Sequence, residues 1–182
     1  IPEPDGVYEP KTIISAGRLV PWKGFSVLIM MMRSLPEWKL SIAGDGPLRK
    51  ELENIAVENG VSIRVSFLGP VSKEELLRKI QNSEVFVLNT SFESFSFQVV
   101  EVMAVGTPVV TTNIGNLPEI IDNGKSGILI IPNDENALVS SIEHLSSDKI
   151  FREQIITEAR KKSQHFSIEN TLNNLLTHLK KP

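Results

Sequence analysis

Two basic residues that could bind an anion follow the first β-rich run of the chain. Arg18 and Lys23 stand five positions apart in the segment GRLVPWKG, which spans residues 17–24. Arginine binds an anion with a planar fork and lysine with a point charge, so the two side chains could converge on one phosphate group. Most basic side chains in proteins are solvated surface charges, and this simpler interpretation is equally compatible with their position.

Two acidic residues flank what reads as the start of a later helix. Glu93 falls in the loop of the segment TSFESFSFQVVE, and Glu101 follows about two turns into the helix. Free N–H groups at a helix N-terminus favour phosphate, and carboxylates accept hydrogen bonds from hydroxyl groups. Glu101 could therefore bind a ribose diol while Glu93 binds a sugar. The alternative is that Glu93 favours the helix start and Glu101 is an exposed helical acid.

Two further loops contain glycine at positions where the chain turns. Gly44-Asp45-Gly46 resembles the start of a dinucleotide-binding GxGxxG loop, but Arg49 replaces the third glycine and no acidic residue follows at the required distance. We interpret this loop as a tight turn before a helix. The loop 113–119 could fold close to a bound sugar or phosphate, because its Gly and Asn residues tolerate positive φ angles.

Other chemistries lack their residues in this sequence. The histidines at positions 144, 165 and 178 have no metal-ligand spacing, and the chain contains no GxxxxGK[ST] loop, no GxSxG motif and no DxD acid pair. We therefore expect no metal site and no cofactor.

Short β-rich runs alternate with longer amphipathic stretches along the chain. We expect strands at 11–16, 39–43, 62–68, 85–89, 108–112 and 127–131. We expect helices at about 24–34, 47–59, 72–82, 96–105, 116–122, 134–147, 149–164 and 167–180. This alternation predicts the α/β class, with a Rossmann-like, doubly wound parallel sheet whose ligand site lies beyond the carboxyl ends of the strands.

The composition excludes several classes of partner. The 182 residues suit one globular domain, and the formal net charge of −3 gives no attraction to nucleic acid or to an anionic membrane. The longest apolar run, residues 27–32, is far below the roughly 18 residues that span a bilayer, so we expect no transmembrane segment. The chain has no cysteine, which favours a reducing cytoplasm.

Six motifs in one order resemble the C-terminal domain of the family 4 glycosyltransferases, which have the GT-B architecture of two facing Rossmann-like domains. The motifs are GRLVPWKG (17–24), IAGDGPLRKEL (42–52), VSFLGPVSKEEL (65–76), EVFVLNTSFESFSFQVVEVMAVGTPVV (84–110), GNLPEII (115–121) and NGKSGILI (123–130). The seven residues between Glu93 and Glu101 match the paired-glutamate motif of that family.

The resemblance implies a role for each candidate residue. Arg18 and Lys23 would hold the donor diphosphate, Glu101 the ribose, and Glu93 the sugar ring near its anomeric carbon. Arg18, Lys23 and Glu93 would thus be the catalytic groups of this half. We also place five neighbouring residues in the donor site: Gly17, Ser94, Phe95, Ser96 and Phe97. Enzymes of this family transfer a hexose with retention of configuration and generally without a metal, because basic groups stabilise the departing diphosphate.

The sequence departs from the family at three loop positions. Ser94, Ser96 and Asn116 stand where the family usually has glycine. If any of these positions requires a positive φ, the backbone there is strained.

The resemblance also implies a second half that the sequence does not contain. We expect residues 1–10 to be an interdomain linker, 11–166 the nucleotide-sugar-binding domain, and 167–182 a C-terminal helix that packs toward an absent N-terminal domain. That domain would bind the acceptor, a sugar or a lipid-linked glycan, and could bring the cytoplasmic protein to a membrane surface. Two other functions fit the same residues: a non-catalytic nucleotide-sugar-binding subunit, and half of a sugar-nucleotide epimerase.

Overall fold

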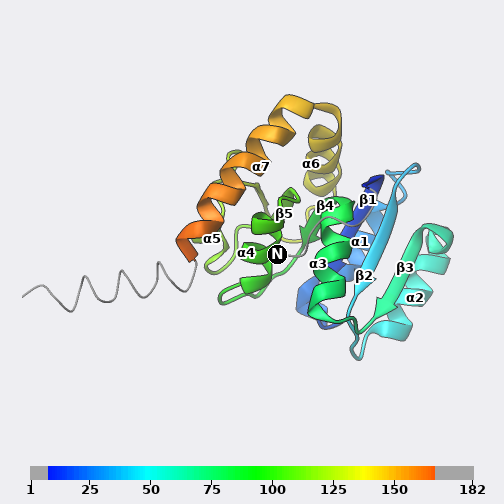
Figure 1. The fold of residues 1–182 in the computed structure, drawn as a ribbon. Helices are drawn as coiled ribbons and strands as arrows, with labels where there is room; N and C mark the ends of the chain where they lie inside the picture. The colour runs from blue at the N-terminus through cyan, green and yellow to red at the C-terminus, as the bar shows by residue number, and fades with distance from the viewer. Residues whose placement is uncertain (1–7, 167–182) are drawn as a thin grey trace, which may run out of the picture.

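A computed structural model describes residues 8–166 of the chain, which form a single sheet with helices on both faces (Figure 1). The sheet has six strands in the order β3-β2-β1-β4-β5-β6, and every neighbouring pair is parallel. This is the strand order of the doubly wound Rossmann fold, so the predicted fold class is confirmed. The strands are β1 (Glu9–Ala16), β2 (Lys39–Ala43), β3 (Val65–Gly69), β4 (Ser83–Leu88), β5 (Val109–Thr112) and β6 (Ile128–Ile130).

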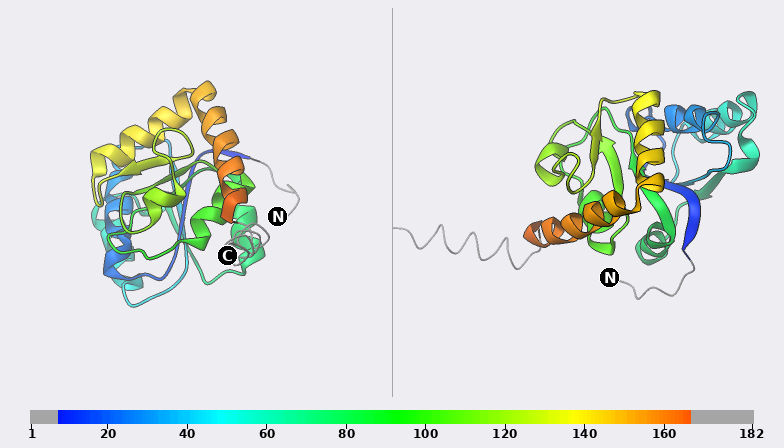
Figure 2. Two further views of the ribbon diagram at one scale, coloured as in Figure 1. Left: turned by 90° about the vertical axis from the view of Figure 1, so that its left-hand side faces the viewer. Right: turned by 90° about the horizontal axis from the view of Figure 1, so that it is seen from above.

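The helices divide between the two faces, as the two views of Figure 2 show. Helices α1 (Phe25–Met31), α2 (Arg49–Glu58) and α6 (Glu135–Ser147) contribute to one buried cluster. Helices α3 (Lys73–Asn82), α4 (Phe97–Val105) and α5 (Leu117–Ile120) contribute to the other, and α7 (Lys149–Ser163) reaches both. Three 3-10 turns complete the described chain: η1 (Pro21–Lys23), η2 (Ser62–Arg64) and η3 (Gln164–Phe166).

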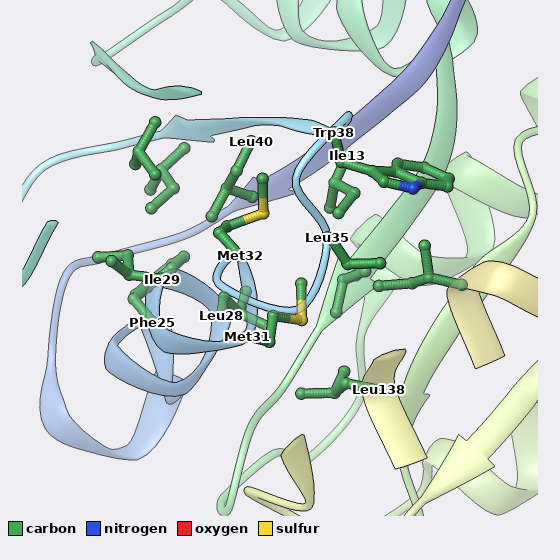
Figure 3. Close-up of a cluster of buried hydrophobic side chains, with 14 of the residues drawn as sticks. Ile13, Phe25, Leu28, Ile29, Met31, Met32, Leu35, Trp38, Leu40 and Leu138 are labelled. Carbon is green, nitrogen blue, oxygen red and sulfur yellow. The ribbon is translucent and has the colours of Figure 1, made fainter. Parts of the chain in front are cut away.

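The central strands contain apolar runs, residues 13–14 in β1 and 85–88 in β4, because both faces of the sheet are covered. Consecutive residues of β1 separate to the two faces, with Ile13 in one cluster and Ile14 in the other. All six residues of β4 are buried. In the first cluster, Met31 and Met32 are fully buried beside the α1 residues (Figure 3), so this part of the methionine run fills the core.

Every strand and helix that we predicted between residues 11 and 164 occurs in the structure, with shifted ends. Residues 62–64, which we expected to open a strand, form η2 instead, and β3 starts only at Val65. Arg64 explains this turn, because its guanidinium donates to the carbonyl oxygens of Met32, Leu35 and Trp38 at 2.7–3.2 Å. The strand β1 begins at Glu9, inside the expected linker. The predicted C-terminal helix lies outside the described residues, and the domain boundaries stay predictions.

The strand order creates a switch point between β1 and β4. These strands are neighbours, but the chain leaves β1 toward α1 on one face and leaves β4 toward α4 on the other. The two connecting loops therefore diverge at the carboxyl edge, which is where open α/β sheets bind their ligands.

Candidate functional site at the carboxyl edge of the sheet

The loop after β1 is held by the loop after β2. Gly17 N donates to the Ala43 carbonyl at 3.0 Å, and Leu19 N donates to the Asp45 carbonyl at 3.0 Å. Gly44 lies so close to the Gly17 carbonyl that no side chain would fit there. The Gly44-Asp45-Gly46 segment is therefore the tight turn that the sequence predicted, and it supports the loop that carries Arg18 and Lys23.

The loop after β1 is also bonded to the loop after β4. The Trp22 carbonyl accepts hydrogen bonds from Ser91 N at 2.8 Å and from Thr90 Oγ1 at 3.2 Å. Thr112 Oγ1, at the end of β5, donates to the Thr90 carbonyl at 2.7 Å. The carboxyl ends of three strands are thus fixed relative to one another.

Asn89, which sequence reasoning missed, holds this edge together. Its side chain is 1% exposed and donates to the Gly24 carbonyl at 3.1 Å, directly after Lys23 in the chain. It also exchanges two hydrogen bonds with Asn133, which adopts a positive φ of 64° in the β6–α6 loop. An asparagine directly after the apolar run 85–88 is the signal that could have identified it, because a buried amide requires partners.

Lys23 and Glu93, two of the predicted catalytic residues, meet directly. The Lys23 ammonium lies 2.7 Å from Glu93 Oε2, and their side chains are only 18% and 16% exposed. The aliphatic part of Lys23 passes over Gly17, where an added Cβ would lie 3.8 Å from Lys23 Cε. The structure therefore brings Gly17, Lys23 and Glu93 together from the two loops at the switch point.

The loop 113–119 also contacts the segment that carries Glu93. Gly115 has a φ of 56° and lies against the backbone carbonyl of Glu93, with no room for a side chain. The close approach that we predicted for this loop is thus made to Glu93. It fixes the backbone that carries the carboxylate.

Arg18 has no partner in the described part of the chain. Its side chain is exposed, and no hydrogen bond or ion pair involves it within residues 8–166. It lies five residues before Lys23 on the same fixed loop, and its charge is not neutralised by any residue of that range.

Glu101 lies in a different environment from Glu93. It is the fifth residue of α4, and so closer to the helix start than we expected. Its carboxylate is 36% exposed and pairs with Lys73 of α3 at 2.5 Å. An exposed ion pair of this kind is weak, so the carboxylate stays accessible to a ligand hydroxyl.

Ser96, one of the two serines that stand where the family usually has glycine, is the N-cap of helix α4. Ser96 has a φ of −102°, and its hydroxyl accepts from Val99 N at 3.4 Å as an N-cap. Within the described residues only Lys11 and Asn133 among non-glycines have a positive φ, so Ser94 and Asn116 are unstrained as well. The three departures from the family are therefore compatible with relaxed backbone geometry.

The aromatic side chains of the two loops at this edge differ in how far they are exposed. Phe95 packs against Phe97 with ring centroids 4.8 Å apart and against Phe166 at 5.8 Å. Phe97 is 71% exposed, and Phe92 and Trp22 are exposed beside Glu93 and Lys23. Phe95 therefore packs within the protein, while the other three rings face outward.

The described residues contain neither a cluster of metal ligands nor a membrane-spanning helix. No group of three or more His, Asp or Glu side chains within residues 8–166 could hold a metal ion. In the same range, no helix is both long enough and apolar enough to cross a membrane.

Comparison with known sequences gives a consistent match. The sequence model of the glycosyl transferases group 1 matches residues 3–162. A glycosyltransferase of Methanocaldococcus jannaschii is 36% identical over 156 residues, which are 84% of this chain and 40% of that protein. The D-inositol 3-phosphate glycosyltransferase of Corynebacterium urealyticum is 34% identical over 177 residues, covering 91% of this chain and 42% of that protein. The chain thus spans about two fifths of the length of these relatives.

Solved structures share the fold. HepE of Anabaena in complex with UDP superposes with a TM-score of 0.87 at 24% identity, over 94% of this chain and 49% of that one. The C-terminal domain of a group 1 glycosyl transferase from Francisella tularensis superposes with a TM-score of 0.79 at 22% identity, over 89% of each chain. The fold is that of the C-terminal domain of GT-B proteins.

Proposed function

The chain belongs to the group 1 glycosyl transferases, and we propose that it is the donor-binding domain of a retaining enzyme that transfers a hexose from a nucleoside diphosphate sugar to a glycan or another acceptor. The observation that carries this proposal is the contact between Lys23 and Glu93 at the switch point of the sheet. This contact supports the proposal because a cation that can bind phosphate lies next to a carboxylate that can accept hydrogen bonds from sugar hydroxyls. The complexes of HepE with UDP and with UDP-glucose support a sugar nucleotide as the ligand.

Each part of the donor finds a matching group at this edge. Lys23 and Arg18 would bind the diphosphate together with the free N–H groups at the start of α4. Glu93 would accept hydrogen bonds from the hexose, and Glu101 from the ribose after Lys73 moves away. No group in this set requires a metal ion, because the two cations neutralise the diphosphate.

The chemical contribution of this domain is to stabilise the leaving group. When the bond between the anomeric carbon and the phosphate oxygen breaks, negative charge grows on the departing diphosphate. Lys23 lies on a loop fixed by backbone hydrogen bonds on both sides, so it is positioned for that charge before the reaction begins. The carboxylate of Glu93 would stabilise the positive charge that develops on the sugar ring.

We further propose that the acceptor site belongs to a second, N-terminal half, in a protein of the cytoplasm. The relatives are more than twice as long as the matched region, which leaves room for another domain of similar size. The domain by itself would bind the donor weakly and transfer nothing.

Substitution of the two cations tests the proposal. A charge-assisted hydrogen bond contributes about 1.5–3 kcal/mol, so Arg18→Ala or Lys23→Ala should weaken binding of UDP or GDP roughly ten- to 150-fold. The affinity for uridine or guanosine should hardly change, because these lack the phosphates. Titration calorimetry on the 182-residue chain measures both, with and without EDTA.

The control is Lys149→Ala, since this exposed lysine lines a hollow with Lys11 and Glu84 at the opposite, amino edge of the sheet. It should leave nucleotide affinity unchanged. Absence of any binding by the unsubstituted chain at millimolar nucleotide would refute the donor site, and a tenfold loss in EDTA would refute metal independence.

A further inference from the structure

Two residues that would bind different parts of the donor contact each other directly. The Lys23 ammonium, which would bind the diphosphate, is paired at 2.7 Å with Glu93, which would bind the sugar. The exposed fractions of 18% and 16% mean that water screens this pair only weakly. The carboxylate and a diphosphate are both anions, so a diphosphate that binds Lys23 either displaces the carboxylate of Glu93 or is repelled by it.

We infer that Glu93 is an internal competitor for the diphosphate site, and that this competition makes the site prefer the intact sugar nucleotide over the free nucleoside diphosphate. The inference rests on the proposed function. It assigns to Glu93 a role in discriminating donor from product, in addition to its contact with the sugar.

The competition involves side chains only, because the backbone is fixed at Lys23 and at Glu93. Gly115 lies against the Glu93 carbonyl, and the loop before Glu93 is bonded to Trp22 through Ser91. Lys23 N donates to the Val20 carbonyl at 3.1 Å. Displacing the carboxylate therefore requires rotation about side-chain bonds only, and the displaced group stays close to the site.

The displaced carboxylate fares differently with the two ligands. When the ligand carries a sugar, hydroxyl groups donate to Glu93 and replace the lost bond to Lys23. When the ligand is a free diphosphate, Glu93 has lost its cation, has little access to water and lies near a second anion. Loss of the ion pair therefore weakens binding of the free nucleoside diphosphate more than binding of the sugar nucleotide, because only the sugar gives Glu93 a new partner.

The chain contains its own reporter for a binding experiment. It has two tryptophans, of which Trp38 is 3% exposed and Trp22, next to Lys23, is 46% exposed. Quenching by acrylamide will therefore report mainly on Trp22. A ligand at Lys23 should change this quenching, and its concentration dependence gives the affinity.

The test compares the chain with Glu93→Gln, which keeps the shape of the side chain and removes its charge. We expect the variant to bind UDP roughly three- to tenfold more tightly, because a partly buried ion pair no longer competes. Its affinity for UDP-glucose should stay the same or fall, so the preference of the chain for UDP-glucose over UDP should shrink or reverse. GDP and GDP-glucose provide a second pair of ligands.

A second carboxylate and a second substitution serve as controls. Glu37→Gln removes the charge of an exposed residue just before β2, at the amino edge of the sheet, where no ion pair within residues 8–166 involves it, and should change UDP affinity less than about twofold. Glu93→Ala should shift UDP affinity in the same direction as Glu93→Gln. Urea unfolding confirms that each variant is folded.

The outcomes separate the two claims. If the unsubstituted chain binds neither UDP nor GDP, nor their sugar conjugates, the proposed function fails. If it binds the diphosphates but the Glu93 variants bind them equally or more weakly, the donor site stands and the competition by Glu93 is wrong. Equal affinities of the unsubstituted chain for UDP and UDP-glucose would overturn the inference in the same way.

Discussion

Gly115 is one of the residues that fix the backbone of Glu93. Gly115 has a left-handed backbone and touches the Glu93 carbonyl, so any side chain at this position must displace the loop. Gly60 has a similar φ of 66° but meets nothing within 4 Å. A substitution at either glycine therefore has the same cost of a left-handed backbone, but only a side chain at Gly115 would clash with the Glu93 carbonyl.

Comparison of Gly115→Ala with Gly60→Ala separates these effects. Gly60→Ala should lower the free energy of unfolding by about 1 kcal/mol, which is the cost of a left-handed backbone for alanine. Gly115→Ala should cost roughly 1–3 kcal/mol more and should weaken sugar nucleotide binding, because the Glu93 loop must move. Urea unfolding and nucleotide titration measure the two effects. Equal costs at the two positions would contradict the proposed contact.

Asn89 acts on elements rather than on a ligand. Its amide connects the end of β4 to the start of α1 through Gly24 and to the loop before α6 through Asn133. We expect Asn89→Ala to lower the free energy of unfolding by about 1–3 kcal/mol, because the Asn133 N–H loses its partner and the Gly24 carbonyl keeps only the long hydrogen bond from Leu28 N at 3.4 Å. Diphosphate binding should weaken as well, since Gly24 follows Lys23.

Asn133→Gly is the matched variant for this network. Glycine suits the left-handed backbone of position 133 and keeps the N–H that donates to Asn89, so the cost should stay below about 1 kcal/mol. Urea unfolding of the two variants provides the measurement. A larger loss for Asn133→Gly than for Asn89→Ala would show that the left-handed turn, and not the amide of Asn89, holds the three elements together.

The elements were predictable where local patterns agreed with the tertiary structure. The spacing of Ser72 and Glu75 is typical of a helix start, and in the structure the Ser72 hydroxyl accepts a hydrogen bond from Glu75 N at 3.1 Å at the start of α3. The turn η2 was not predictable, because it depends on Arg64 reaching carbonyls about 30 residues earlier in the chain. Periodicity within a segment contains no information about such a partner.

For the candidate site, the positions of the residues along the fold were predictable, but their side-chain partners were not. The order of motifs placed Arg18, Lys23 and Glu93 at one edge of the sheet. The ion pair between Lys23 and Glu93 was not anticipated, because it joins residues 70 positions apart through side-chain conformations. The partner of Glu101, which is Lys73 on the neighbouring helix α3, was missed for the same reason.

At the scale of the molecule, the sheet consists of two groups of three strands that meet between β1 and β4. The first group supplies Lys23 and Trp22, and the second supplies Asn89 and Glu93. Both buried clusters contain side chains from both groups. The site therefore exists only where the two groups are joined.

This arrangement makes the chain a candidate for fragment complementation. Cutting after the exposed Pro70, in the connection between β3 and α3, gives one polypeptide with the cation and another with the carboxylate. We expect the coexpressed fragments to assemble, and a sugar nucleotide to tighten their association by bridging Lys23 and Glu93. Affinity capture through a tag on one fragment, with and without UDP-glucose, measures this effect. If UDP-glucose does not change the amount of the second fragment that is captured, the sugar nucleotide does not bridge the two fragments. If UDP-glucose raises that amount, the split domain becomes a two-component sensor for a sugar nucleotide.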